Sequence, residues 1–149
     1  MPTAARLVSA IAMVALAWFV SDMVTEAMLL DDPDQNFGNF KYINLGIAAL
    51  LGWRLLGSRV GNDYSVSIGL GLTAVAALVF WCVLAHAFIE MFKLSIDRRF
   101  DGPMEAIVGA IALGVEYASE LGRTKIIVVL VGSGILLGPL AEHVSRRWR

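Results

Sequence analysis

The sequence contains a single cysteine, Cys82, and only two histidines among its 149 residues. One cysteine excludes an internal disulfide, and so few soft ligands exclude the common zinc frameworks of cysteine and histidine. Charged residues make up only 17% of the chain, and the formal net charge is −1. Because a nucleic-acid-binding surface needs clustered positive charge, we expect no nucleic-acid partner.

Sequence motifs that carry known chemistry are also missing. The chain has no nucleotide-binding glycine loop, no zinc-hydrolase helix motif and no serine-centred elbow. The Gly69-Leu70-Gly71 triplet lies within an apolar run, so it is not a phosphate-binding loop. We therefore predict a protein that is not an enzyme and that has no catalytic, cofactor-binding or metal site.

Apolar residues are abundant instead, at 58% of the chain, whereas soluble domains contain about 45–50%. They gather in long runs, and residues 66–85 contain no charge at all, which meets the length rule for a membrane-spanning helix. We therefore expect the lipid bilayer to be a partner of this protein. We predict an all-α membrane protein forming a single domain over 1–149, with four transmembrane helices at about 5–30, 38–57, 65–92 and 125–145.

The first apolar run has two possible interpretations. Arg6 precedes it, and Ala15-Leu16-Ala17 has the small-x-small shape of a signal-peptide cleavage site. However, the apolar pattern continues well beyond Ala17. We therefore interpret residues 5–30 as a retained transmembrane helix.

Residues 103–121 form a different kind of segment, because their polar residues share one narrow arc of a helical wheel. That arc contains Asp101, Glu105, Gly109, Ala112, Glu116, Ser119, Glu120 and Arg123. Burying a carboxylate near mid-bilayer costs at least about 2.5–3.5 kcal/mol. We therefore predict an interfacial amphipathic helix, and a buried span with a polar stripe is the alternative.

Acidic side chains in the first span are candidates for a site, because acids within the membrane are often functional. Asp22 and Glu26 are spaced i, i+4 near the end of that span. They form either a proton or cation site or the point where the helix reaches the membrane interface.

The third span carries a second polar group. Cys82, His86 and Glu90 follow one another at four-residue intervals, with Lys93 on the same arc. Thiolate and imidazole suit soft metal ions, so a metal or thiol-reactive site is one interpretation. The other is that Cys82 is a small apolar residue and that the helix leaves the membrane at His86, with Glu90 and Lys93 paired. We favour the second.

Small residues form a ridge on the last span, comprising Gly134, Gly138, Ala141 and Ser145. Such ridges allow two helix backbones to approach closely. The ridge is expected to pack within one molecule, and the alternative is the interface of a homo-oligomer.

Charge does not decide the orientation, because lysine and arginine divide evenly between the two predicted sides. The acidic residues Asp31, Asp32 and Asp34 lie on the side opposite Arg6. We predict a multi-pass protein with both termini in the cytoplasm.

Several short runs, spread over nearly the whole chain, are similar to those of one family. They are Met1-Pro2-Thr3-Ala4-Ala5-Arg6-Leu7-Val8, Gly52-Trp53-Arg54, Gly57-Ser58-Arg59-Val60-Gly61, Phe80-Trp81, Asp97-Arg98-Arg99-Phe100-Asp101-Gly102-Pro103-Met104-Glu105-Ala106, Gly114-Val115-Glu116-Tyr117, and the ending Ala141-Glu142 with Arg146-Arg147-Trp148. The chain resembles the TrgA family, small bacterial inner-membrane proteins associated with tellurite resistance. The resemblance implies a bacterial inner-membrane location and a role in tolerance of tellurite or a related stress. It carries over no site residues.

Two other functions remain open. The protein is alternatively an accessory subunit of a larger respiratory or photosynthetic membrane complex, or a small oligomeric channel or transporter. One short helical bundle offers little room for a transport pathway unless several copies assemble.

Overall fold

The computed structural model of the protein describes residues 4–31, 38–96 and 103–147. Within these ranges every regular element is helical, which confirms the all-α class. The elements are α1 (Ala4–Asp31), α2 (Phe40–Leu51), the π-helix η1 (Gly52–Leu56), α3 (Tyr64–Ile96), α4 (Pro103–Leu121) and α5 (Thr124–Arg147). The acidic residues Asp32 and Asp34 and the arginine-containing run at 97–102 lie outside the described residues.

Three of these helices, α1, α3 and α5, are long and apolar enough to cross a membrane. They correspond to the predicted spans at 5–30, 65–92 and 125–145. The remaining predicted span, 38–57, is α2 followed directly by η1, which are only 12 and 5 residues long. The predicted interfacial segment is α4, a separate helix of 19 residues.

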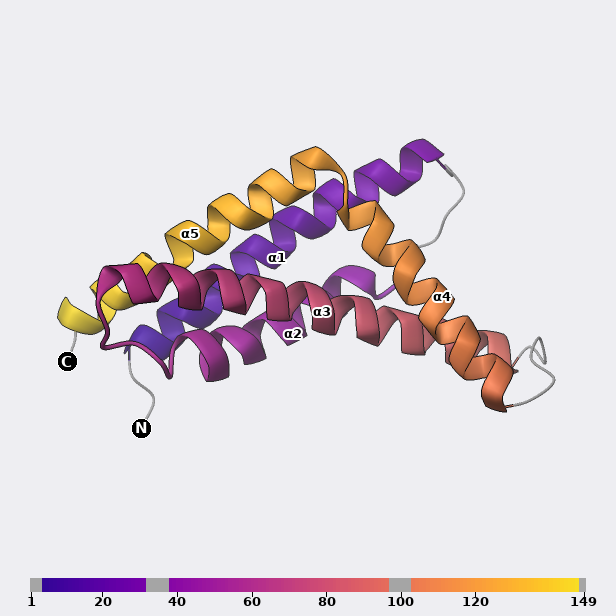
Figure 1. Ribbon diagram of the computed structural model, residues 1–149, viewed down its shortest axis with the longest axis horizontal. Helices are drawn as coiled ribbons and strands as arrows, with labels where there is room; N and C mark the ends of the chain where they lie inside the picture. The colour runs from indigo at the N-terminus through magenta and orange to yellow at the C-terminus, as the bar shows by residue number, and fades with distance from the viewer. Residues whose placement is uncertain (1–3, 32–37, 97–102, 148–149) are drawn as a thin grey trace.

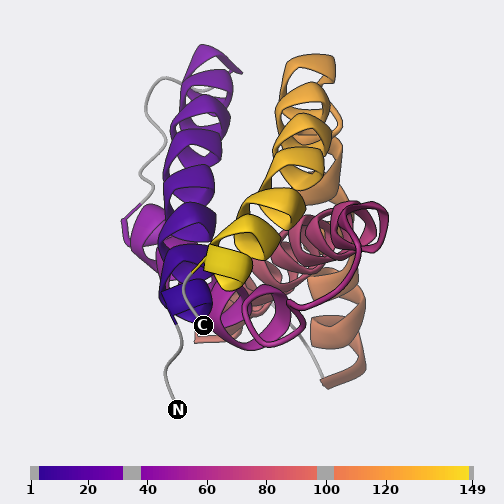
Figure 2. The same cartoon turned by 90° about the vertical axis from the view of Figure 1, so that its left-hand side faces the viewer.

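The helices form a bundle that is tight at one end and open at the other. The start of α1 and the end of α5 lie at the tight end, together with the turn between η1 and α3 (Figure 1). There α3 crosses α5, and the two helices then diverge. At the open end α4 bridges the gap between them (Figure 1), while α1 and α5 also spread apart (Figure 2).

The crossing of α3 and α5 depends on glycine. A Cβ atom at Gly138 would overlap the carbonyl oxygen of Ser67, and one at Gly71 would overlap the carbonyl oxygen of Gly134. No side chain fits between the two backbones at this point. In the structure Gly134 and Gly138 of the predicted ridge therefore pack against α3 of the same chain. Ala141 is also buried, and Ser145 is half-buried.

A second close contact joins α1 to η1. A Cβ atom at Gly52 would lie 2.6 Å from the Cα of Ala10, and one at Gly57 would lie 2.5 Å from the Cα of Arg6. The side chains of Met13 and Leu56 are fully buried beside this contact. The core thus begins here and continues along α1, α3 and α5 as far as Val24, Leu78 and Ile126.

Large apolar side chains also cover much of the outer surface. Leu136 on α5, Leu50 on α2 and Phe80 on α3 are 70%, 67% and 60% exposed. In water such a surface would be costly, because each buried apolar side chain contributes roughly 1.5–3 kcal/mol. This distribution of apolar residues is that of a protein whose helices face lipid.

Candidate functional site

A chain of polar side chains links three helices in the interior. The Nδ2 group of Asn44 on α2 donates a hydrogen bond to the Oγ of Ser21 on α1, at 3.0 Å. The Nε2 of His86 on α3 lies 2.8 Å from the Oδ1 of Asn44. Because the amide oxygen only accepts, the Nε2 of His86 is the donor. Ser21 and Asn44 are both buried.

Aromatic rings enclose the imidazole of His86. Phe40 on α2 stacks on it with ring centroids 4.4 Å apart, and Tyr117 on α4 meets it edge-on at 6.3 Å. Burial raises the pKa of Tyr117, and the charges of Glu90 and Glu116 raise it further. The phenol therefore stays protonated and neutral at physiological pH.

A small cavity lies beside this chain of polar groups, and we call it the polar cavity. Its volume is about 60 Å³, and all five α-helices contribute to its wall, including Ser21, Asn44, Cys82, His86 and Tyr117. A buried water needs roughly 10–15 Å³ of such volume. The polar cavity can therefore hold a few water molecules or one small polar group.

The predicted Cys82, His86 and Glu90 group is only partly brought together. Cys82 and His86 both line the polar cavity. Glu90 instead pairs with Lys93, whose Nζ lies 3.1 Å from its carboxylate, as the i, i+3 spacing indicates. Among the described residues, no three histidine, cysteine, aspartate or glutamate side chains are close enough to hold a metal ion.

Asp22 faces outwards, although its neighbour Ser21 faces the interior. Its side chain is 58% exposed, and its carboxylate lies 2.6 Å from the Nζ of Lys41 on α2. Lys41 also lies 3.5 Å above the ring of Trp18. Glu26, one turn further along α1, is exposed as well. These acids therefore belong to the outer surface and not to the polar cavity.

A second polar cluster, at the tight end, is one that sequence reasoning missed. The buried Glu142 of α5 accepts hydrogen bonds from the backbone N–H groups of Gly61 and Asn62, at 2.7 and 3.1 Å. Arg146 pairs with Glu142 at 2.9 Å and donates to the carbonyl oxygen of Asn62 at 2.8 Å. Its guanidinium lies 4.7 Å from the ring of Tyr64. We call these residues the Glu142 cluster, and it ties the η1–α3 turn to α5.

The sequence contained signals for the residues that were missed. Glu142 and Arg146 are spaced i, i+4, and Gly61-Asn62-Asp63 is a combination of residues typical of a turn, in which Gly61 adopts a positive φ of 107° in the structure. Asn44 is the one polar side chain in an otherwise apolar run from Ile43 to Trp53. An amide buried in such a run requires a partner, but nothing local identifies Ser21 or His86 as that partner.

No protein-family model, no curated protein and no solved structure matches this chain.

Proposed function

We propose that this protein crosses the bacterial inner membrane four times, with α4 lying along the outer interface. The three long apolar helices support three of the crossings. The fourth crossing would be made by α2 and η1 together. It is supported by the charged residues that bracket α1, α5 and the α2–η1 segment.

Charged side chains of these segments lie at two heights along the helix axes of the bundle. Arg6 and Asp22 on α1 are separated by about 24 Å along the helix, and Lys125 and Glu142 on α5 by about 25 Å, at about 1.5 Å per residue. Lys41 and Arg54 bracket α2 and η1 at about 20 Å. These separations, about 20–25 Å, are shorter than the hydrocarbon thickness of about 30 Å, and long charged side chains extend the reach of a helix end toward the interface.

Contacts between α1 and the α2–η1 segment place the two on the same levels. Lys41 pairs with Asp22 at one level, and the Gly57 backbone lies against Arg6 at the other. The α2–η1 segment therefore runs over the same depth as the charge-free part of α1. This agreement in depth between α1 and the α2–η1 segment is the main observation that supports four membrane crossings.

Reporter fusions test the topology. A fluorescent protein that matures only in the cytoplasm, fused after Arg149, is expected to fluoresce. An alkaline phosphatase inserted at residue 35 is expected to be active, because that position would lie outside. Activity of the phosphatase after Arg149 instead would show an odd number of crossings or the reverse orientation.

We further propose a role in tolerance of tellurite or a related stress, exerted without catalysis. This part rests on the resemblance described above. Some residues that carry the resemblance contact one another in the fold, because Gly61 in one run bonds to Glu142 in another. Tyr117, in a third, lies at the polar cavity. The resembling runs therefore coincide with contacts that hold this fold together.

Deletion of the gene tests this role. The tellurite concentration that stops growth is expected to fall severalfold in the deletion strain and to recover when the wild-type gene is restored. Equal tolerance in the deleted and restored strains would refute the proposal.

A role as an accessory subunit of a larger membrane complex is the second candidate, and the surface of α4 favours it. Met104, Val115 and Ile111 are 73%, 66% and 64% exposed on this helix. Such side chains suit contact with another membrane protein. Purification from native membranes in mild detergent is expected to retain such a partner, identified by mass spectrometry, if this function is correct.

A further inference from the structure

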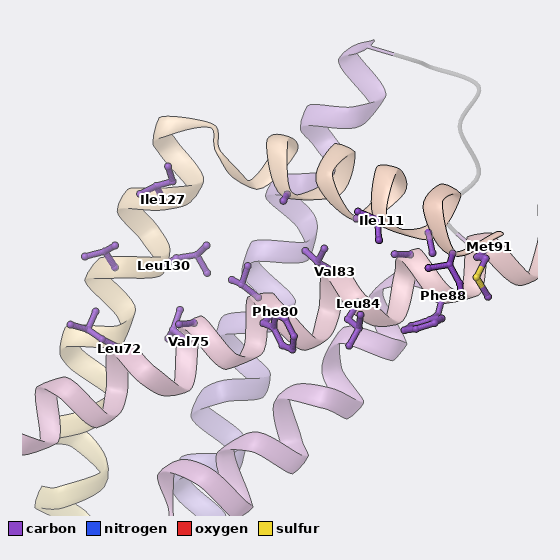
Figure 3. Close-up of a pocket in the computed structure, with 18 residues that line it drawn as sticks. Leu72, Val75, Phe80, Val83, Leu84, Phe88, Met91, Ile111, Ile127 and Leu130 are labelled. Carbon is purple, nitrogen blue, oxygen red and sulfur yellow. The ribbon is translucent and has the colours of Figure 1, made fainter. Parts of the chain in front are cut away.

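A large groove opens between α3, α4 and α5, and we call it the apolar groove. Its volume is about 810 Å³, within the range of pockets that hold small molecules. All 18 residues that line it are apolar. Figure 3 shows Leu72, Val75 and Leu130 at one end of the groove and Phe88, Met91 and Ile111 at the other.

The groove exists because α4 presents small residues to α3. Ala110, Gly114 and Ala118, spaced one turn apart, all line it. A Cβ atom at Gly114 would lie 3.8 Å from the Cβ of Ala87 and 3.9 Å from the Cγ1 of Val83, so the backbone is near α3 without filling the space. Larger side chains at these positions would close the groove.

The apolar groove adjoins the polar cavity. Val79, Val83 and Leu130 line both of them. On α4, Gly114 faces the groove, whereas Tyr117 faces the polar cavity. The apolar groove and the polar cavity are therefore neighbouring spaces, and these three side chains lie at the boundary between them.

The polar cavity favours one kind of ligand group. When the imidazole of His86 is neutral and its Nε2 donates to Asn44, its Nδ1 carries the lone pair and acts as an acceptor. It suits a hydroxyl group that donates a hydrogen bond. A volume of about 60 Å³ excludes a phospholipid headgroup, and the wall contains no lysine or arginine to bind an anion.

We propose that the apolar groove and the polar cavity together bind one lipophilic alcohol or phenol. Its single long apolar tail lies in the groove between α3, α4 and α5, and its hydroxyl donates to the Nδ1 of His86. Two walls of the groove belong to helices that are long and apolar enough to cross a membrane, so the tail reaches the site from the lipid phase. This binding site is independent of the proposed role in tellurite tolerance.

Photolabelling of the full-length protein in phosphatidylcholine nanodiscs tests the site. The probe is octadecanol with a diazirine in the middle of its chain. We expect labelled peptides from 79–91 on α3 and 107–118 on α4. Oleyl alcohol is expected to compete for this labelling about three- to tenfold better than octadecene, since the alcohol adds one hydrogen bond.

Variants locate the tail and the head separately. Gly114→Leu is expected to abolish the groove labelling by filling the space. Gly69→Leu is the matched control, because Gly69 lies on α3 with open space around it and outside the groove. His86→Phe keeps an aromatic ring but removes the acceptor, so oleyl alcohol and octadecene are then expected to compete equally.

Three results would overturn the proposal. The first is labelling spread evenly over the outer faces of α1, α3 and α5, which is the pattern of ordinary bilayer lipid. The second is equal competition by alcohol and hydrocarbon in the wild-type protein. The third is Gly114→Leu labelled like the wild type. If His86→Phe does not fold, the competition experiment and the Gly114→Leu and Gly69→Leu pair still decide the matter.

Discussion

The carboxylate of Glu142 joins residues that are about 80 positions apart in the chain. Its partners are two backbone N–H groups of the η1–α3 turn and the side chain of Arg146. We predict that Glu142→Ala lowers the free energy of unfolding by about 1–3 kcal/mol, the cost of leaving part-buried donors without an acceptor. Thermal unfolding in detergent micelles measures the change.

Glu26→Ala serves as the control for this prediction, because Glu26 is exposed on α1. It is expected to unfold like the wild type. A Glu142→Ala protein as stable as the control would show that the cluster contributes nothing to the fold.

A second prediction at the scale of single residues concerns Cys82. It is a single free thiol in α3 that lines the polar cavity, and Glu90, two turns further along α3, is paired with Lys93. A dithiol or a bound cofactor would be expected of a tellurite reductase. We predict that Cys82→Ser supports the same tellurite tolerance as the wild type in cells without the chromosomal copy. Lost tolerance at normal protein abundance would establish a thiol mechanism.

At the scale of elements, the crossing of α3 and α5 is the contact most sensitive to side-chain size. We predict that Gly138→Leu prevents folding, because a side chain there meets the Ser67 backbone. Gly132→Leu, on the same helix with open space around it, is expected to fold normally. Size-exclusion chromatography with light scattering and thermal unfolding distinguish the two. A stable Gly138→Leu monomer obtained from a wild-type oligomer would place the ridge at a subunit interface.

The position of α4 relative to the membrane gives another prediction at this scale. Glu105 and Glu116 are both exposed and lie near opposite ends of the helix. Single cysteines at these positions, in a Cys82→Ala background, are expected to react with a membrane-impermeant thiol reagent from the same outer side. Labelling of Glu105→Cys from one side and protection of Glu116→Cys would indicate a helix that enters the bilayer.

At the scale of the whole molecule, the bundle combines a tight end with an open end. Glycine contacts and the Glu142 cluster hold the tight end, where α1 begins and α5 ends (Figure 1). At the open end α3 and α5 diverge, and α4 bridges them with the apolar groove between the three helices. The glycine-packed part and the part with internal space therefore lie toward opposite ends of the same bundle.

The sequence by itself determined the all-α class and three long apolar helices, because length and apolar runs are local properties of the chain. It also indicated that α4 differs from the others, through its polar stripe. The pairing of Glu90 with Lys93 followed from helical spacing alone. Only the tertiary structure decided that Asn44 bonds to His86, that Glu142 bonds to Gly61 and that a groove opens beside α4. Those contacts depend on the rotation and tilt of helices relative to one another, which no local pattern of residues specifies.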